Sequence, residues 1–259
     1  MLLRQFFVGA TIFLSNGLAI SQSSENTLAE LLWVVAEKDN HRIMMADYDG
    51  SDWQEPYSIY KSESPLSSPA IGTDHKGNKI IVFSELYRPT KSRLLKMVKP
   101  ASIEEWEDPT VFSDFGHENL GASIVVDAAN AIWVFWSANQ GDLDDIVYKK
   151  SGPTGWTKAQ VAHAPNNVPD YQPSAMLTAE GEVKLVWKTY DFSSNRYIDS
   201  NRLFSLDNSA QNVYKSPLDK SQELLLDNVA LPSYVSGDSR TIVHFPNNIM
   251  TQSMRLEHK

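Results

Sequence analysis

The sequence predicts an all-β fold, a β-propeller built from four-stranded antiparallel blades. An aromatic residue recurs fourteen residues after one repeated position, in the pairs Pro69 with Phe83, Ala122 with Trp136, and Pro173 with Trp187. A second series of tryptophans recurs at spacings of 53 and 50 residues: Trp53, Trp106 and Trp156. A period of about fifty residues is the length of one propeller blade. No stretch beyond residue 21 sustains apolar residues at helical spacing, so helices are not expected.

One repeat, residues 121–156, shows the pattern of a single blade. Two β-rich runs, 122–126 and 131–136, flank a tight turn, and a third run, 145–150, precedes a Gly/Pro turn. Short β-rich runs separated by turn residues are typical of a strand meander. Turns of similar composition fall at the same place in the neighbouring repeats, so the same meander is expected there.

The other units follow in chain order. The first has strands at 31–36, 42–47 and 53–60, and the second at 68–71, 79–83, 94–98 and 106–112. The third is the repeat above, with a last strand at 156–162. The fourth has strands at 173–177, 183–187 and 202–206 and a weaker one near 213–214, and the fifth has strands at 231–235, 241–245 and 250–256.

The first unit lacks an innermost strand, and the fifth lacks an outermost one. Exposed strand edges invite pairing with other chains, so we expect both ends of the chain to take part in ring closure. Residues 24–30 are a further candidate strand for the terminal blade. Five blades fit the length best, and four or six are the alternatives.

Composition is that of an ordinary globular protein, with 42% hydrophobic and 21% charged residues. We expect one propeller domain over residues 22–259, because closed all-β folds reach this length. The formal net charge of −9 argues against nucleic acid as a partner, since polyanions are bound by clustered Lys and Arg. Cysteine is absent, which excludes disulfides. Nucleotide-binding, serine-hydrolase and zinc-protease motifs are absent, so we expect no cofactor, and we expect a monomer.

Residues 1–21 have the pattern of a secretory signal. Arg4 supplies a positive start, residues 6–14 an apolar core, and residues 19–21 a small-residue cleavage site. The alternative is a membrane anchor, but that requires about twenty apolar residues and the polar run 15–17 interrupts the segment. No other segment is long and apolar enough to cross a bilayer. We therefore expect an exported protein, periplasmic or secreted, that does not span a membrane.

The repeats resemble those of the sialidase-like β-propeller superfamily, the BNR or Asp-box type, whose turns carry Asp and Gly ahead of a Trp. The matching fragments are 47–53, 151–156, and Gln172-Pro173-Ser174-Ala175 with Gly181. The Asp-box, S-x-D-x-G-x-T-W, is degenerate here, because Gly50 and Trp53 both follow Asp47 one residue late. The resemblance implies a propeller over nearly all of residues 22–259.

In the sialidases of this superfamily an arginine triad, including an early Arg-Ile-Pro, holds the substrate carboxylate, and a Tyr nucleophile acts with a Glu and an Asp. This sequence does not match the triad. Arg88-Pro89 lacks the middle residue, and Arg42-Ile43 is followed by Met44. The resemblance therefore implies ligand binding rather than the cleavage of sialic acid.

The channel face is where a propeller places its functional loops. The loops that leave the second strand of a blade and those that enter the first strand of the next meet there. Two carboxylates about 5 to 10 Å apart across such a cleft can hydrolyse a glycosidic bond. The candidates for catalysis are Glu85, Asp170 and Asp191. The candidates for ligand binding are Glu37, Tyr87, Arg88, His117, Glu118, Tyr171, Tyr190 and Arg196. The plain alternative is that these are solvated loop residues of an acidic protein.

Two groups of aspartates carry oxygen ligands of the kind that Ca²⁺ prefers: Asp142, Asp144 and Asp145, and Asp47, Asp49 and Asp52. Neither group matches a full calcium-binding loop, so we interpret both as turns and expect no metal site. The recurrent tryptophans are expected to pack between blades rather than to bind a ligand.

The sequence therefore predicts an exported sialidase-like propeller that binds a glycan or another extracellular ligand on its channel face without catalysis. One alternative is a glycoside hydrolase, either a divergent sialidase or another propeller glycosidase, that uses the loop carboxylates. A second alternative is a protein-interaction scaffold.

Overall fold

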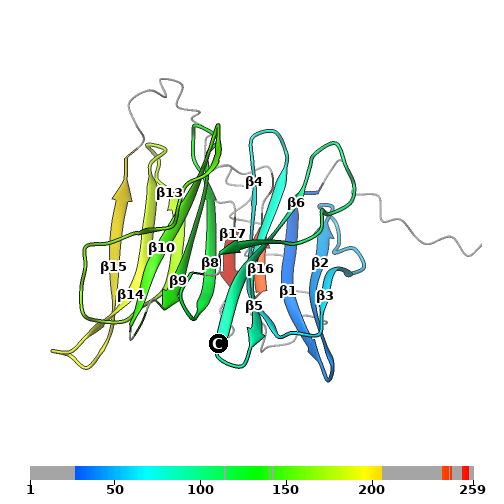
Figure 1. The fold of residues 1–259 in the computed structure, drawn as a ribbon. Helices are drawn as coiled ribbons and strands as arrows, with labels where there is room; N and C mark the ends of the chain where they lie inside the picture. Colours follow the sequence, from blue (N-terminus) through cyan, green and yellow to red (C-terminus); the bar gives the residue numbers. More distant parts are fainter. Residues whose placement is uncertain are drawn as a thin grey trace, which may run out of the picture.

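The computed structural model describes residues 27–113, 115–139, 141, 143–205, 241–244, 246 and 253–256. These residues form antiparallel strands, turns and bends and contain no helix (Figure 1). The predicted all-β class is confirmed. The proposed signal segment, 1–21, lies outside the described residues.

The strands form four sheets, which we call blades 1 to 4. Blade 1 has the order β17-β16-β1-β2-β3, with β1 (Ala29–Glu37), β2 (Asn40–Tyr48), β3 (Tyr57–Ser62), β16 (Thr241–His244) and β17 (Ser253–Leu256). Blade 2 has the order β4-β5-β6-β7, with β4 (Leu66–Thr73), β5 (Lys79–Arg88), β6 (Lys91–Lys99) and β7 (Thr110–Ser113).

Blade 3 has the order β8-β9-β10-β11, with β8 (Asn119–Val126), β9 (Ile132–Asn139), β10 (Asp144–Gly152) and β11 (Gly155–Trp156), and a short β12 (Gln160–Val161) also pairs with β10. Blade 4 has the order β13-β14-β15, with β13 (Asp170–Leu177), β14 (Val183–Asp191) and β15 (Arg196–Phe204). The strands predicted at 213–214 and 231–235 lie outside the described residues, so the five-blade count stays a prediction.

Two outer strands differ from the sequence prediction. The strand expected at 53–60 begins only at Tyr57, because the Asp49 carboxylate accepts the backbone N–H groups of Ser51 and Asp52 and holds a turn before it. The strand expected at 202–206 begins at Arg196 and pairs with β14 from its first residue. Most side chains of β15 are exposed, so no apolar alternation marks it in the sequence.

The sequence repeat is a repeat of backbone conformation. The innermost strands of blades 2, 3 and 4 each have a register shift at one residue with positive φ: Ser68 at 50°, Gly121 at 67° and Gln172 at 54°. The turns that follow these strands also share a left-handed residue: Gly77, Asn130 and Gly181. The backbone therefore follows the same course through the inner strand and the following turn in blades 2, 3 and 4.

Apolar side chains from neighbouring blades interleave to form the core. The cluster between blades 2 and 3 includes Val82, Phe112 and the fully buried Trp136, and Trp156 packs edge-on against Phe112 with ring centroids 4.8 Å apart. The cluster between blades 3 and 4 includes Phe135 and Trp187. The prediction that recurrent tryptophans pack between blades is confirmed for these three.

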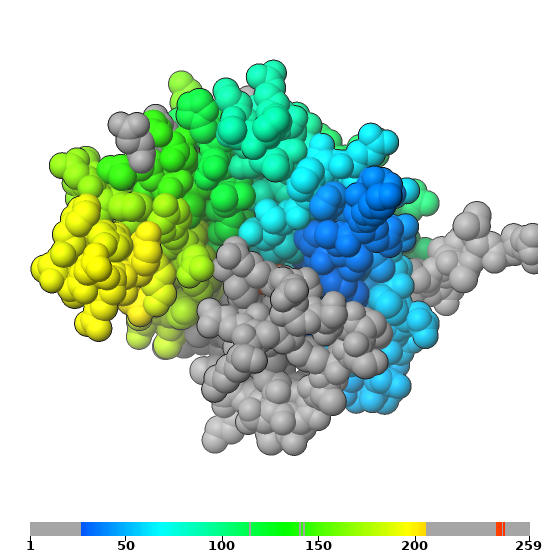
Figure 2. Space-filling view, turned by 90° about the horizontal axis from the view of Figure 1, so that it is seen from below, coloured from blue at the N-terminus to red at the C-terminus, as the bar shows by residue number. Residues whose placement is uncertain are grey.

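Both ends of the described chain meet in blade 1. Strand β16 pairs with the edge of β1 that β2 leaves free, with Leu31 opposite Val243 and Leu32 opposite Ile242. Both ends were expected to take part in ring closure, and both contribute strands to this sheet. The strands predicted at 241–245 and 250–256 as part of a separate fifth unit instead join the first unit, because β16 pairs with the free edge of β1. Seen from below, the blades follow one another in an arc from blue through green to yellow (Figure 2).

Candidate functional site

A pocket of about 390 Å³ opens between blades 3 and 4. It lies where the innermost strands begin and the second strands end, which is the end of the blades at which the channel-face loops were expected. Its lining residues come from six strands: Leu120, Gly121, Ser137, Asp144, Tyr171, Gln172, Lys188 and Tyr197. Ligand pockets in proteins commonly measure about 300 to 1,000 Å³, so this pocket has the size of a small-molecule site.

Tyr171 and Asp144 form the polar centre of the pocket. The hydroxyl of Tyr171 hydrogen-bonds to the Asp144 carboxylate, and this bond, with burial, raises the pKa of Tyr171. Asp144 is buried, at 9% exposure. The ring of Tyr197 meets that of Tyr171 edge-on, with centroids 5.7 Å apart. Two tyrosine rings and the Asp144 carboxylate, a hydrogen-bond acceptor, therefore face the same pocket.

Ser137 and Lys188 complete the polar lining. The Ser137 side chain is 5% exposed, and its hydroxyl has no hydrogen-bond partner among the described residues. A buried hydroxyl left without a partner is costly, so it favours a bound hydroxyl or water at this point. The Lys188 ammonium lies 2.6 Å from Asp199 at the exposed edge.

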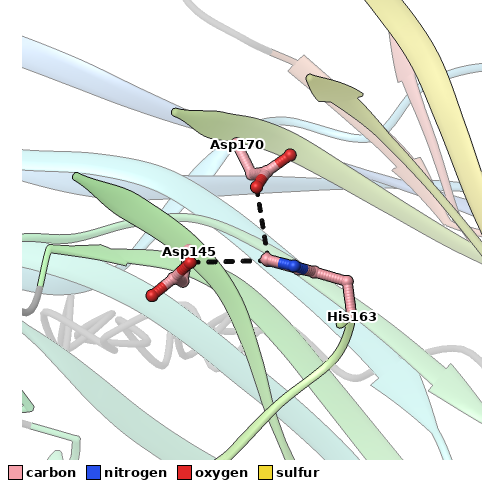
Figure 3. A group of neighbouring side chains, drawn as sticks. All are labelled: Asp145, His163 and Asp170. Carbon is pink, nitrogen blue, oxygen red and sulfur yellow. Dashed lines mark ion pairs between the residues drawn. The ribbon is translucent and has the colours of Figure 1, made fainter. Parts of the chain in front are cut away.

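A second group of side chains lies next to the pocket, and it consists of Asp145, His163 and Asp170 (Figure 3). Asp145 follows Asp144 on β10, and Asp170 precedes Tyr171 on β13, so the two strands carry both groups at adjacent positions. The His163 Nε2 atom lies 3.3 Å from Asp170 and 3.6 Å from Asp145. Burial raises the pKa of Asp145, and the Asp170 carboxylate raises it further, against the lowering effect of His163.

Asp170 is fully buried, and its carboxylate is held by hydrogen bonds. It accepts the indole N–H of Trp187 at 2.8 Å, the hydroxyl of Thr189 at 2.6 Å and the amide N–H of Asn166 at 2.8 Å. Asn119, one repeat earlier, accepts the indole N–H of Trp136 in the same way, at 3.0 Å. One part of the role of Asp170 is therefore structural.

His163 has a defined orientation. Its Nδ1 atom lies 2.8 Å from the Ala164 carbonyl oxygen, and its Nε2 atom accepts the Ile146 N–H at 3.3 Å. The ring stacks on Trp187, with centroids 5.7 Å apart. A wide hollow of about 810 Å³, lined by His163, Asn166 and Thr189 among others, adjoins it.

The three candidates for catalysis lie on three different strands and have separate partners. Glu85 on β5 is paired with Arg93 at 2.8 Å and accepts a hydrogen bond from Ser62. Asp191 caps the hairpin between β14 and β15, where the hydroxyls of Ser193 and Ser194 lower its pKa to about 2. No hydrogen bond or ion pair joins Glu85, Asp170 and Asp191 to one another in the part of the chain that the structure describes.

Of the eight candidates for ligand binding, Tyr171 lines the pocket. Tyr190 meets Tyr197 edge-on at 5.3 Å beside it. The others lie elsewhere: Glu37 pairs with Arg42, Arg88 lies over the Tyr87 ring, His117 and Glu118 are exposed, and Arg196 begins β15. The roles of all eight stay predictions.

The sequence did not predict six of these polar and aromatic residues as site residues: Ser137, Asp144, Asp145, His163, Lys188 and Tyr197. Asp144 was interpreted as part of a turn, but it begins β10. Ser137 and Lys188 directly follow the recurrent tryptophans Trp136 and Trp187, so the repeat could have indicated that they occupy equivalent positions. No sequence signal marks His163, since its partners are on other strands.

The described residues include no helix long and apolar enough to cross a membrane. No protein-family model matches the sequence, and no curated protein matches it either.

Solved structures are similar to this chain in fold. A thermostable family-43 glycoside hydrolase matches with a TM-score of 0.51 and 13% identity, over 74% of this chain and 73% of that chain. A Hadza microbial sialidase matches with a TM-score of 0.52 and 9% identity, over 68% of this chain and 42% of that chain. A GH93 α-L-arabinofuranosidase of Fusarium graminearum, in complex with arabinobiose, matches with a TM-score of 0.51 and 13% identity, over 70% of this chain and 63% of that chain. Identities this low show the fold alone. The chain therefore shares its fold with these structures, and this fold is the β-propeller that its repeats predicted.

Proposed function

We propose that this protein is exported and binds a short glycan in the pocket between blades 3 and 4 without cleaving it. The observation that carries the proposal is the convergence of Tyr171, Tyr197, Asp144 and Lys188 on one pocket of about 390 Å³. Tyrosine rings pack against the apolar faces of sugars, and a carboxylate and an ammonium group hydrogen-bond to sugar hydroxyls. The unpartnered Ser137 hydroxyl adds one more polar contact.

Two further observations support the proposal. Three solved structures with this fold are named as a glycoside hydrolase, a sialidase and an α-L-arabinofuranosidase, which favours a carbohydrate ligand. The pattern of residues 1–21 supports export.

The lining of the pocket favours binding over hydrolysis. Most glycoside hydrolases place two carboxyl groups about 5 to 10 Å apart across the scissile bond. Asp144 is the one carboxylate among the described lining residues. Asp145 and Asp170 are adjacent in sequence to lining residues but are engaged with His163.

Isothermal titration calorimetry against a glycan panel that includes arabinobiose and a sialylated trisaccharide tests the proposal. We expect at least one member to bind, and we expect Tyr197→Ala and Asp144→Asn each to weaken it about tenfold or more, a loss of about 1.4 kcal/mol. Tyr87→Ala and Asp191→Asn are the matched controls, because both side chains lie outside the pocket lining. A folded protein that binds no member, or an equal loss in the controls, contradicts the proposal.

A second candidate function is glycoside hydrolysis, and the hydrogen bond from Tyr171 to Asp144 favours it. In this reaction, based on the tyrosine nucleophile that the resemblance to sialidases implies, the Tyr171 oxygen bonds to the anomeric carbon as the glycosidic C–O bond breaks, and the tyrosine proton passes to Asp144. An aryl leaving group departs as the phenolate, and water then attacks the anomeric carbon, releases the sugar and returns a proton to the tyrosine oxygen. Release of 4-nitrophenol from aryl-glycosides measures it. Turnover that disappears in Tyr171→Phe while binding persists supports hydrolysis, and no turnover by the wild type rejects it.

A further inference from the structure

We propose that Asp145, His163 and Asp170 form a Zn²⁺ site that joins blade 3 to blade 4. Asp145 lies on β10 of blade 3, His163 lies between β12 and β13, and Asp170 begins β13 of blade 4. The site does not depend on what the neighbouring pocket binds. It differs from the expectation, drawn from the sequence, of no metal site.

The spacing of the three ligand atoms suits tetrahedral zinc. The His163 Nε2 atom is 3.3 Å from Asp170 Oδ2 and 3.6 Å from Asp145 Oδ1, and all three atoms lie within 4.8 Å of one another. Zinc binds histidine nitrogen and carboxylate oxygen at about 2.0 to 2.2 Å, which places tetrahedral ligand atoms about 3.3 to 3.6 Å apart. An ion therefore fits after small movements, chiefly of Asp145, whose side chain is partly exposed.

The arrangement of charge at this point favours a cation. The carboxylates of Asp145 and Asp170 each place an oxygen atom near His163 Nε2, at 3.6 and 3.3 Å. Two carboxylates this close together repel each other unless a positive charge lies between them. A divalent ion balances both carboxylates, and imidazole with carboxylate ligands suits zinc.

The groups around the ligands are those that hold metal ligands in place. Metal-binding histidines commonly donate their second ring N–H to a carbonyl or carboxylate, and ligating carboxylates are themselves hydrogen-bonded. Here Ala164 accepts from His163, and Trp187, Thr189 and Asn166 donate to Asp170.

A route for the ion and a fourth ligand are also present. The open hollow of about 810 Å³ that adjoins His163 is also lined by Asn166, Thr189 and Ser200. Zinc sites with three protein ligands keep a water at the fourth position. Since the three ligands come from two blades, the ion would act as a cross-link in the folded state and would stabilise it in proportion to its binding.

Calorimetric titration of the untagged full chain with Zn²⁺ alone tests the proposal. We expect one ion per chain, and a melting temperature raised by about 5 to 10 °C at a zinc concentration about one hundred times Kd. Asp170→Asn and His163→Gln should each weaken binding about a hundredfold or more. Asp170→Asn should fold, because Asn119 makes the equivalent bond to Trp136 in blade 3. His75→Gln, which removes an exposed histidine in the turn before β5, should bind zinc as the wild type does.

A proton is the competing occupant, and a second measurement separates the two cases. Heteronuclear NMR of the His163 imidazole, recorded with and without metal, reports whether the ion binds at its Nε2 atom. We expect the Nε2 resonance to shift on addition of zinc but not of Mg²⁺. An unshifted Nε2 resonance, or zinc affinity equal in the wild type and Asp170→Asn, would overturn the proposal.

Discussion

Buried aspartates in this protein anchor tryptophans and turns. Asp127 is fully buried, and one carboxylate oxygen accepts the backbone N–H groups of Ala129 and Ala131 at 3.0 and 2.8 Å. The other accepts the indole N–H of Trp133 at 2.8 Å. The Lys150 ammonium also lies 3.4 Å from this carboxylate. A carboxylate used in this way needs no catalytic explanation, and its removal leaves three hydrogen-bond donors without an acceptor and Lys150 without this ion pair.

We expect Asp127→Ala to lower the free energy of unfolding by about 2 to 4 kcal/mol. Asp74 is the matched control, because it accepts backbone N–H groups in the equivalent turn of blade 2 but is half-exposed and bonds no indole. Asp74→Ala should cost about 0.5 to 1.5 kcal/mol. Urea unfolding monitored by tryptophan fluorescence measures both. Equal losses at the two positions would show that the indole bond and burial contribute little.

Residue chemistry alone placed only part of the candidate site. Tyr171 was named because it falls near the start of a predicted strand in a repeat, and it lines the pocket. Glu85 and Asp191 looked alike in sequence, but one is engaged by Arg93 and the other caps a hairpin. His163 could not be found, because its role depends on carboxylates from β10 and β13 that only packing brings together.

At the scale of the strand, the repeated element is a bulge with one left-handed residue near the start of each inner strand. Gly121 holds this position in β8 with φ at 67°, beside the pocket, and a Cβ added there would have its nearest neighbour, the Pro173 Cδ atom, at 4.0 Å. A side chain at position 121 therefore has enough space, and the positive φ of this residue is what disfavours a substitution. Ser68 and Gln172 have side chains and still adopt the same left-handed conformation at the equivalent bulges of blades 2 and 4.

We expect Gly121→Val to lower the free energy of unfolding by about 1 to 2 kcal/mol, because a β-branched residue strongly disfavours the left-handed region. Gly152→Val is the control, since Gly152 has no positive φ and its nearest atom is 3.7 Å away. That change should alter stability by no more than about 0.5 kcal/mol. Thermal or urea unfolding of both variants measures these changes. A free energy of unfolding that is unchanged in Gly121→Val would mean that the backbone of the bulge adjusts to the valine without cost.

At the scale of the whole molecule, the repeated blade could be predicted from the sequence more easily than the pairing of the two chain ends in blade 1. Each blade needs the same turn, bulge and aromatic residue, so a period of about fifty residues is visible locally. Closure pairs Leu31 with Val243, and no local pattern records a partner more than two hundred residues away. It was inferred instead from the missing strand of the first unit. The first part of β15, residues 196–201, was missed because most side chains of this strand are exposed and show no apolar alternation.

The junction where the chain closes on itself also buries charge. Glu30 on β1 is fully buried, pairs with Lys79 of blade 2, and lies 3.8 Å from the His244 ring on β16. Burial raises the pKa of Glu30, against the lowering effect of Lys79, and burial likewise raises the pKa of Asp47, which the Glu30 charge raises further. A carboxyl group with a raised pKa holds its proton more tightly in the folded state than in the unfolded state.

The stabilisation that Glu30 provides is therefore present below the pKa of an unfolded glutamate, about 4.3, and is lost as pH rises through the higher folded value. Replacing Glu30 by Gln removes this titration. We expect the stability of Glu30→Gln, relative to the wild type, to increase as pH rises from 4 to 7, as measured by urea unfolding at three pH values in that range. Glu55→Gln, at an exposed position before β3, should differ from the wild type by the same amount at each pH. A difference for Glu30→Gln that stays constant across the range would mean that its ion pair with Lys79 fully offsets the cost of burial, and that ring closure in this propeller is insensitive to pH at this point.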